Sequence, residues 1–242
     1  MIPVWLHIAS IFFLLIGFLA AVIIIADEWR RPQQMWIMNL VWPICALFGS
    51  ILWLWFYFHY GRTAKRKADA SHHHGHGHDM DRSAFSVIVA KATSHCGAGC
   101  TLGDILAEWL AFAFPAITIW LGWHTIFSEK MFAVWVLDFI FAYLFGIFFQ
   151  YFSIAPMRNL GLRDGIWAAV KADTLSLTAW QVGMYGFMAI AVFGIFRDLL
   201  GARLEVVTPE FWFMMQIAML CGFVTSYPVN WWLIKAGWKE EM

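Results

Sequence analysis

Two cysteines, a histidine and two carboxylates lie within fourteen consecutive residues near the middle of the chain. They are His95, Cys96, Cys100, Asp104 and Glu108. From Cys96 onward they recur at every fourth position, so on a helix they share one face that drifts slowly around the axis. Thiolate and imidazole ligands select soft or borderline metals such as Cu(I) and Zn²⁺, and a carboxyl group inside an apolar helix is typical of an ion or proton path. The pattern predicts a path for a metal ion or a proton.

The spacing of the two thiols excludes the commonest cysteine sites. Cys-x3-Cys without a second pair is neither a structural zinc signature nor the Cys-x-x-Cys of a redox exchanger. A structural alternative is that Thr101 to Asp104 forms a helix capping box, with Thr101 as the N-cap residue and the preceding glycines as a turn. That alternative accounts for Asp104 but leaves the cysteines and Glu108 unexplained.

A second group of metal ligands lies in the long polar segment after residue 61. Five of the nine histidines fall within seven residues there: His72, His73, His74, His76 and His78. Short histidine-rich tracts bind borderline divalent metals and Cu(II), so this segment would gather ions. A solvated loop with loose metal affinity and no part in transport is the alternative.

Methionines form two further pairs, each four residues apart. Met184 and Met188 share one predicted helix, and Met215 and Met219 share another. Thioethers are ligands for Cu(I), so both pairs are candidate metal ligands within the membrane. The same spacing also fits simple packing in an apolar helix.

The composition indicates an integral membrane protein. Of 242 residues, 62% are hydrophobic and 13% are charged, whereas soluble domains are about half apolar and a quarter charged. The net charge is zero and there is no basic stripe, which excludes a nucleic-acid-binding protein. The first apolar segment lacks a basic start and a cleavage pattern, so it is expected to be a membrane helix.

The apolar runs predict an all-α, polytopic membrane helix bundle with six transmembrane helices. Three parts follow: a two-helix N-terminal membrane part (1–60), a cytoplasmic His-rich loop (61–93) and a four-helix membrane core (94–242). The predicted helices are about 4–26, 35–60, 102–127, 132–155, 174–196 and 209–235.

The distribution of Lys and Arg predicts the orientation. The loops after the first, third and fifth helices hold five basic residues, and the other two loops with the C-terminal tail hold eleven. Because basic loops stay in the cytoplasm, both termini are expected there. The Cys-x3-Cys stretch would then lie at the cytoplasmic mouth of the third helix.

Polar residues elsewhere extend the predicted path. Asp138 and Glu108 are expected at opposite depths of the membrane, which would suit a route across it. Asp173 and Gln181 make the fifth helix unusually polar, so it is expected to face the interior. His124 would be an outer relay or an interfacial residue. Interhelical hydrogen bonds are the structural alternative for the two acids.

Four segments of this sequence carry a family resemblance: 95–104 (His-Cys-Gly-Ala-Gly-Cys-Thr-Leu-Gly-Asp), 122–127, 171–184 and 227–235, the last containing Pro-Val-Asn-Trp-Trp-Leu-Ile-Lys. On these segments the chain resembles a bacterial family of small polytopic membrane proteins that is known only as a domain of unknown function. The resemblance extends over residues 94–242. It implies a membrane location and no particular activity.

The residues therefore predict a membrane protein that binds a soft transition metal, copper first and zinc as the alternative, and transports it. The chain has no P-loop, so no ATPase of its own is expected. We also expect a location in the bacterial inner membrane and no binding of nucleic acid. The chain is expected to form a homo-oligomer or to bind a membrane partner subunit. The rival functions are a thiol–disulfide/quinone oxidoreductase that uses Cys96 and Cys100, and a non-catalytic subunit of a membrane complex. Heme held by His7, His59 or His124 is a further alternative.

Overall fold

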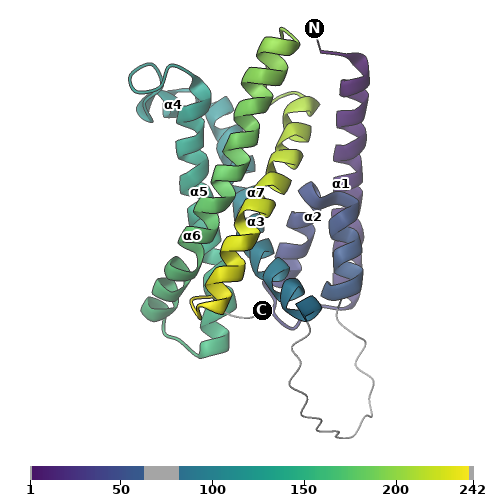
Figure 1. Cartoon of the computed structure of the whole chain (residues 1–242), viewed down its shortest axis with the longest axis vertical. Coiled ribbons are helices and arrows are strands. Elements are labelled where there is room, and N and C mark those ends of the chain that lie inside the picture. Colours follow the sequence, from purple (N-terminus) through teal and green to yellow (C-terminus); the bar gives the residue numbers. More distant parts are fainter. Residues whose placement is uncertain (1, 63–81, 240–242) are drawn as a thin grey trace, which may run out of the picture.

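A computed structural model describes residues 2–62 and 82–239, and this part of the chain is built from helices (Figure 1). Seven are α-helices, and two π-helical segments, η1 and η2, continue α2 and α6. Their bounds are α1 Val4–Arg30, α2 Met38–Phe56, η1 Tyr57–Gly61, α3 Arg82–Ala113, α4 Ala116–Trp120, α5 Lys130–Arg158, α6 Leu162–Ala189, η2 Ile190–Leu199 and α7 Pro209–Lys235.

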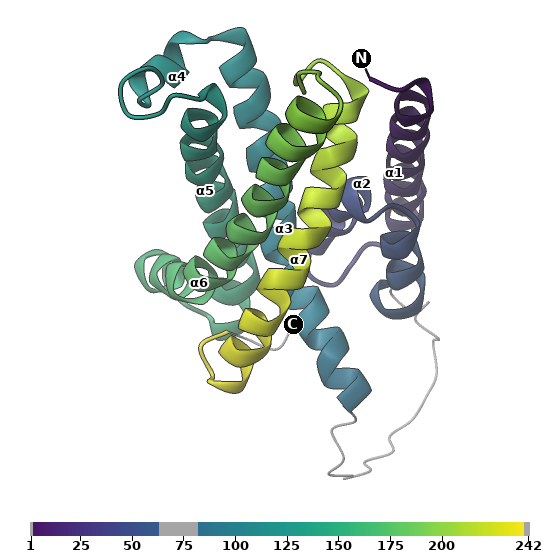
Figure 2. The same cartoon turned by 45° about the horizontal axis from the view of Figure 1, so that its top comes forward.

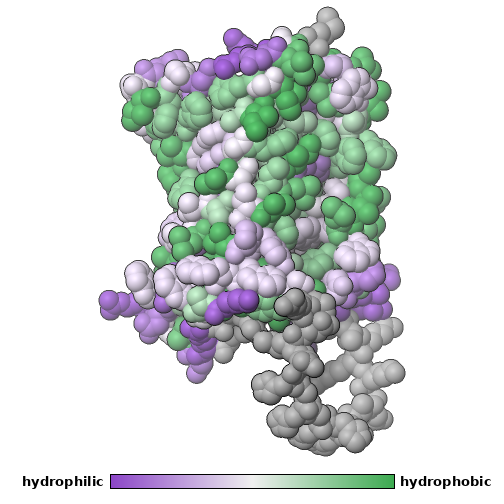
Figure 3. Space-filling model, viewed as in Figure 1, coloured by the Kyte–Doolittle hydropathy of each residue, from purple (hydrophilic) through white to green (hydrophobic). Residues whose placement is uncertain are grey.

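Five of the described helices are long and apolar enough to cross a membrane, which confirms the predicted all-helical, membrane-type architecture. An apolar band separates polar ends in the space-filling view (Figure 3). On α1, Phe12 and Phe18 point outward with 58% and 60% of their surface exposed. A surface of this kind is favourable against lipid rather than water. The five helices are Val4–Arg30, Met38–Gly61, Lys130–Pro156, Leu162–Leu199 and Pro209–Lys235.

The second apolar segment, α2 with η1, folds back on itself instead of running straight. Its backbone reverses at Ser50, where φ is 47° and ψ is −126°. The two arms then pack ring against ring, with Trp42 5.4 Å from Phe56 and 5.5 Å from Tyr57 between centroids. The single span predicted over 35–60 is therefore a helical hairpin. Length and apolarity could not distinguish the two, because the same aromatic side chains suit lipid contact and arm-to-arm packing.

The hairpin starts and finishes at the same end of the bundle. The Arg62 guanidinium lies 2.6 Å from the Asp27 carboxylate, near the end of α1. The Gln33 side chain, in the connection between α1 and α2, donates a hydrogen bond of 3.0 Å to the Gly61 carbonyl. The segment after Arg62 therefore leaves from the end at which α1 finishes.

The central helix is α3, which packs against α2, α5, α6 and α7 (Figures 1 and 2). It begins at Arg82, twenty residues before the predicted start of the third span, so the predicted loop over 61–93 ends before that residue. Because α3 carries several polar side chains, it is not among the five helices that are apolar enough by composition to cross a membrane. Thr101 is not an N-cap residue: it lies inside α3, and its hydroxyl donates to the Gly97 carbonyl at 2.7 Å.

Small residues hold α3 against α5. A Cβ atom on Gly99 would lie 2.8 Å from the Gly146 nitrogen, and one on Gly103 would lie 2.5 Å from the Ala142 nitrogen. These distances are shorter than side chains tolerate, so the two backbones touch directly. Small residues spaced four apart on both helices permit such contact in a membrane. Gly99, which the capping-box alternative would place in a turn, therefore forms part of a helix–helix interface.

The starts of α1 and α7 lie side by side. The His7 Nδ1 atom is 2.7 Å from the Glu210 carboxylate, and the Phe13 and Phe213 rings stack at 5.2 Å. The two helices are therefore parallel, and Val4 and Lys235 lie at opposite ends of the bundle (Figure 1). This differs from the prediction that both termini share one side, because the α2 hairpin removes one crossing.

The α3–α5 interface predicts that Gly103→Ala destabilises the protein. The added methyl group would force the two backbones apart, which typically costs about 1–3 kcal/mol. The matched control is Gly186→Ala in α6, where a Cβ atom meets nothing within 4 Å. Thermal unfolding in detergent should show a lower midpoint for Gly103→Ala and an unchanged or higher one for Gly186→Ala. Equal midpoints in all three proteins would contradict the interface.

Candidate functional site

Three carboxyl groups meet inside the bundle, Asp104 and Glu108 from α3 and Asp138 from α5. Asp104 is 0% exposed and Asp138 is 1% exposed. Each of the two aspartates is repelled electrostatically by Glu108. Within residues 2–62 and 82–239, none of the four aspartate oxygens has a hydrogen-bond partner. An unpaired charge in such surroundings is costly, so this carboxyl cluster requires protons or a cation to neutralise it.

Helix α6 lines the carboxyl cluster with two polar side chains one turn apart. The Gln181 amide faces Asp104 without reaching hydrogen-bonding geometry. Tyr185 interacts electrostatically with Asp138 and Asp104, while its hydroxyl donates to the Trp135 carbonyl at 2.9 Å. The sequence analysis identified Gln181 but missed Tyr185, although its position four residues later places it on the same helix face.

The carboxyl cluster corrects the predicted depths of Glu108 and Asp138. Both lie near the same end of the bundle, since Glu108 is five residues before the end of α3 and Asp138 is eight residues after the start of α5. The prediction placed them at opposite depths because it started the third span at residue 102. Moving the start of the helix to Arg82 carries Glu108 across to the far end.

A cavity of about 360 Å³ connects the carboxyl cluster with this end of the bundle. Glu108, Lys130 and Glu205 are its charged lining residues. The Lys130 ammonium attracts the Glu108 carboxylate and donates to the Ala111 carbonyl at 3.2 Å. Because Glu205 is exposed and Glu108 is partly buried, this vestibule leads from the surface to Glu108, the outermost member of the carboxyl cluster.

The two cysteines lie near the middle of α3, one and two turns before Asp104, and are both 0% exposed. Their sulfur atoms are 4.0 Å apart. With metal–sulfur bonds of about 2.3 Å, that separation corresponds to a sulfur–metal–sulfur angle of about 120°. The pair therefore has the spacing to hold one soft ion between its sulfur atoms.

His95 does not complete a three-ligand site with these sulfurs. Its Nδ1 atom lies 3.1 Å from the Ser153 hydroxyl on α5. Neighbouring residues on a helix point about 100° apart, which turns His95 away from Cys96. Among the residues that the structure describes, no three His, Cys, Asp or Glu side chains form a group that could hold a metal ion. The histidines at 72–78 lie outside the described residues.

Close to the cysteine pair, a buried lysine approaches Asp173. The Lys239 ammonium lies 3.7 Å from the Asp173 carboxylate, and the two side chains are 0% and 1% exposed. The chain turns back at Gly237, where φ is 69°, and the Trp238 N–H donates to the Leu233 carbonyl. Asp173 also interacts with Cys96, so a cation of the protein itself lies beside the cysteine pair. The sequence analysis missed Lys239, because nothing in its position near the end of the chain indicates burial.

The two methionine pairs and His124 lie in three different surroundings, of which only the cavity lined by Met215 and Met219 also borders Asp104. Met184 and Met188 pack in the hydrophobic core, 1% and 2% exposed. Met215 and Met219 line a different cavity from the vestibule, where the Met219 sulfur lies 3.9 Å from the Thr101 hydroxyl. His124 is exposed near α4, with its ring stacked on Trp123, as expected of an interfacial residue.

Comparison with known families confirms the resemblance to a family of unknown function. Residues 87–239 match the family model described as "Domain of unknown function (DUF4396)", and the chain belongs to this family. The match begins in α3 and ends at Lys239, so it contains the carboxyl cluster, the cysteine pair and the buried lysine but not α1 or α2. Neither the curated proteins nor the solved structures include a match.

The buried ion pair predicts that Lys239→Met destabilises the protein strongly. Removing the ammonium leaves Asp173 buried without a counter-charge, and breaking a buried pair typically costs about 3–5 kcal/mol. Adding Asp173→Asn to the same chain should restore most of the loss, because no charge then remains unpaired. Arg163→Met, at an exposed position of α6, is the control. Chemical unfolding in detergent measures these variants, Asp173→Asn alone and the unaltered protein, and additive effects of the two substitutions would refute the pairing.

Proposed function

We propose that this member of the DUF4396 family is an integral membrane protein that moves a cation through its helix bundle along α3. The carboxyl cluster supports this proposal most directly. Asp104 and Asp138 are buried, repelled by Glu108 and without hydrogen-bond partners in the described part of the chain. Acidic groups inside a membrane are stable when protonated or when a cation accompanies them, and they mark ion routes. The vestibule at Glu108 supplies an entrance from one end.

The cargo that these donors suit best is a soft transition metal, Cu(I) before zinc. Thiolates retain such ions and carboxylates do not, so Cys96 and Cys100 would receive the metal. The carboxyl cluster would carry the protons that couple its movement to a gradient.

The ends of the bundle differ in charge, which supports an orientation. Among the described residues, ten Lys and Arg belong to the end where α1, α5 and α7 finish and α3 and α6 begin, and three belong to the other end. For five crossings, the positive-inside rule then gives an outer N-terminus and a cytoplasmic end of α7, as in a bacterial inner membrane. The ten are Arg30, Arg31, Arg62, Arg82, Lys91, Arg158, Arg163, Lys171, Lys235 and Lys239; the three are Lys130, Arg197 and Arg203.

Transport in proteoliposomes tests the proposed path. Under reducing conditions, an enclosed chelating dye reports Cu(I) entry and a pH dye reports proton movement. Asp104→Asn and Asp138→Asn should each lower the initial rates at least about tenfold, which equals ~1.4 kcal/mol in a barrier. Asp198→Asn is the control, since that side chain is 75% exposed.

A cysteine variant distinguishes the movement of Cu(I) from the movement of protons. Cys96→Ser with Cys100→Ser should stop Cu(I) entry and leave the proton signal in place. Copper entry at the unaltered rate in this variant would remove copper as the cargo. Unchanged rates for both ions in Asp104→Asn and Asp138→Asn would overturn the path itself.

Thiol labelling in intact cells tests the five-crossing orientation. Trp29, 88% exposed, lies at the end of α1, and Trp120, 84% exposed, lies at the end of α4. A membrane-impermeant maleimide should label Trp120→Cys in intact cells and Trp29→Cys only after the membrane is opened. The unaltered protein, whose four cysteines are buried or partly buried, sets the background. Labelling of Trp29→Cys from outside would instead support six crossings.

A further inference from the structure

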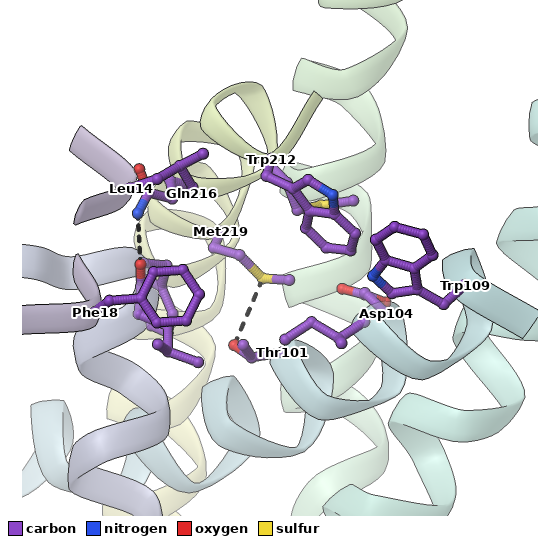
Figure 4. A pocket seen from close by; sticks show the side chains of 12 residues that line it. Leu14, Phe18, Thr101, Asp104, Trp109, Trp212, Gln216 and Met219 are labelled. Atoms are coloured by element: carbon purple, nitrogen blue, oxygen red, sulfur yellow. Dashed lines mark hydrogen bonds between the residues drawn. The ribbon is translucent and has the colours of Figure 1, made fainter. Parts of the chain in front are cut away.

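A second cavity, here called the lateral cavity, lies between α1, α2, α3 and α7 (Figure 4). Its volume is about 320 Å³, at the lower end of the range for small-molecule sites. Most of its wall is apolar, including Phe18, Phe48 and Met219. Neither Glu108 nor the cysteine pair is among its lining residues.

The rim of the lateral cavity faces the apolar surface of the bundle. Phe18 on α1 is 60% exposed, and Trp109 on α3 is 44% exposed. Both belong to the band of helix surface that a bilayer would cover. A ligand would therefore enter sideways from the membrane, which favours a molecule with a substantial apolar part.

One charged group lies in the wall of this cavity. In Figure 4 the Asp104 side chain points toward the space between Met219 and the indole rings of Trp109 and Trp212. Asp104 is fully buried, and both of its oxygens lack a hydrogen-bond partner in the described part of the chain. The neighbouring Gln216 amide is engaged, because it donates to the Leu47 carbonyl at 2.6 Å. Asp104 is therefore the group with unused bonding capacity toward a ligand.

The field and the aromatic wall both favour a positive ligand. Glu108 repels Asp104 and so adds to the negative potential there. The rings of Trp109 and Trp212 stack with centroids 6.0 Å apart and an interplanar angle of 16°. Indole faces attract cations, most strongly where water is excluded. An anion would be repelled, and beside a neutral molecule Asp104 has to keep a proton, whereas a cation can replace that proton.

We infer that the lateral cavity binds a hydrophobic organic cation, such as a quaternary ammonium or phosphonium ion, through Asp104 and the Trp109–Trp212 pair. This site differs from the cation path by its entrance, which faces the membrane, and by its apolar wall. The two share only Asp104, so the inference does not rest on the proposed transport of metal.

Equilibrium binding of radiolabelled methyltriphenylphosphonium to the full chain in lipid nanodiscs tests the inference. Saturable binding to one site per chain is expected. Asp104→Asn should weaken it at least about tenfold, and Asp198→Asn should leave it unchanged. Triphenylphosphine oxide, which keeps the three rings without the charge, should not compete. Equal affinity in Asp104→Asn, or equal competition by the neutral compound, would overturn the site.

A cavity-filling variant separates this site from the ion path. Ile105 lines the lateral cavity, so Ile105→Trp should occupy it while keeping Asp104. Phosphonium binding should be lost, and Cu(I) and proton movement in proteoliposomes should persist. Unchanged phosphonium binding in Ile105→Trp would overturn the location. If the unaltered chain conducts ions but never binds the phosphonium, this inference alone fails; if it binds the phosphonium but moves no ions, the proposed function alone fails.

Discussion

Direct backbone contact between α3 and α5 is the constraint on which the remaining structure depends. Gly99 and Gly103 on one helix meet Gly146 and Ala142 on the other, with no room for a Cβ atom on either glycine. This contact excludes lipid and water from the face of α3 that carries its polar side chains. A helix with that many polar groups would be unstable against lipid, and it is tolerated because α2, α5, α6 and α7 surround it. The glycines therefore allow a membrane protein to keep acids and thiols at its centre.

The α2 hairpin completes the enclosure of α3 and returns to the end of the bundle at which it starts. The Cys45 thiol donates to the Ser94 carbonyl at 3.3 Å, which ties the hairpin to α3 beside the cysteine pair. Near the reversal at Ser50, the Leu47 carbonyl accepts the Gln216 amide and so joins the hairpin to α7. A second full crossing would have placed another helix against lipid. The hairpin covers α3 beside the cysteine pair, and the lateral cavity stays open next to the reversal of the hairpin at Ser50.

The sequence was sufficient where apolarity and helix length decide the structure. Both predicted bounds of the last helix, 209–235, agree with α7, and the helical membrane class is confirmed. The sequence was insufficient where a contact with another part of the chain determines the structure. A glycine at residue 103 fits a turn or a helix contact equally well, and only Ala142 on α5 determines which. Lys239 shows the same limit, because its burial depends on Asp173, sixty-six residues earlier. The sequence identified the residues of the cysteine pair and the carboxyl cluster. Their depths in the bundle could be predicted only with the knowledge that α3 starts at Arg82.

The two groups of buried acids differ in how their charge is balanced. Asp173 has a cation of the chain beside it, since Lys239 is held there by the turn at Gly237. Asp104 and Asp138 have no comparable partner within the described residues. A buried anion must be balanced, so a fixed lysine makes the first site a closed ion pair. Lys130 attracts Glu108, but no cation of the described part of the chain accompanies the two aspartates, so a proton or an entering cation would balance them. Both proposals, the ion path and the organic-cation site, draw on this difference, and both include Asp104.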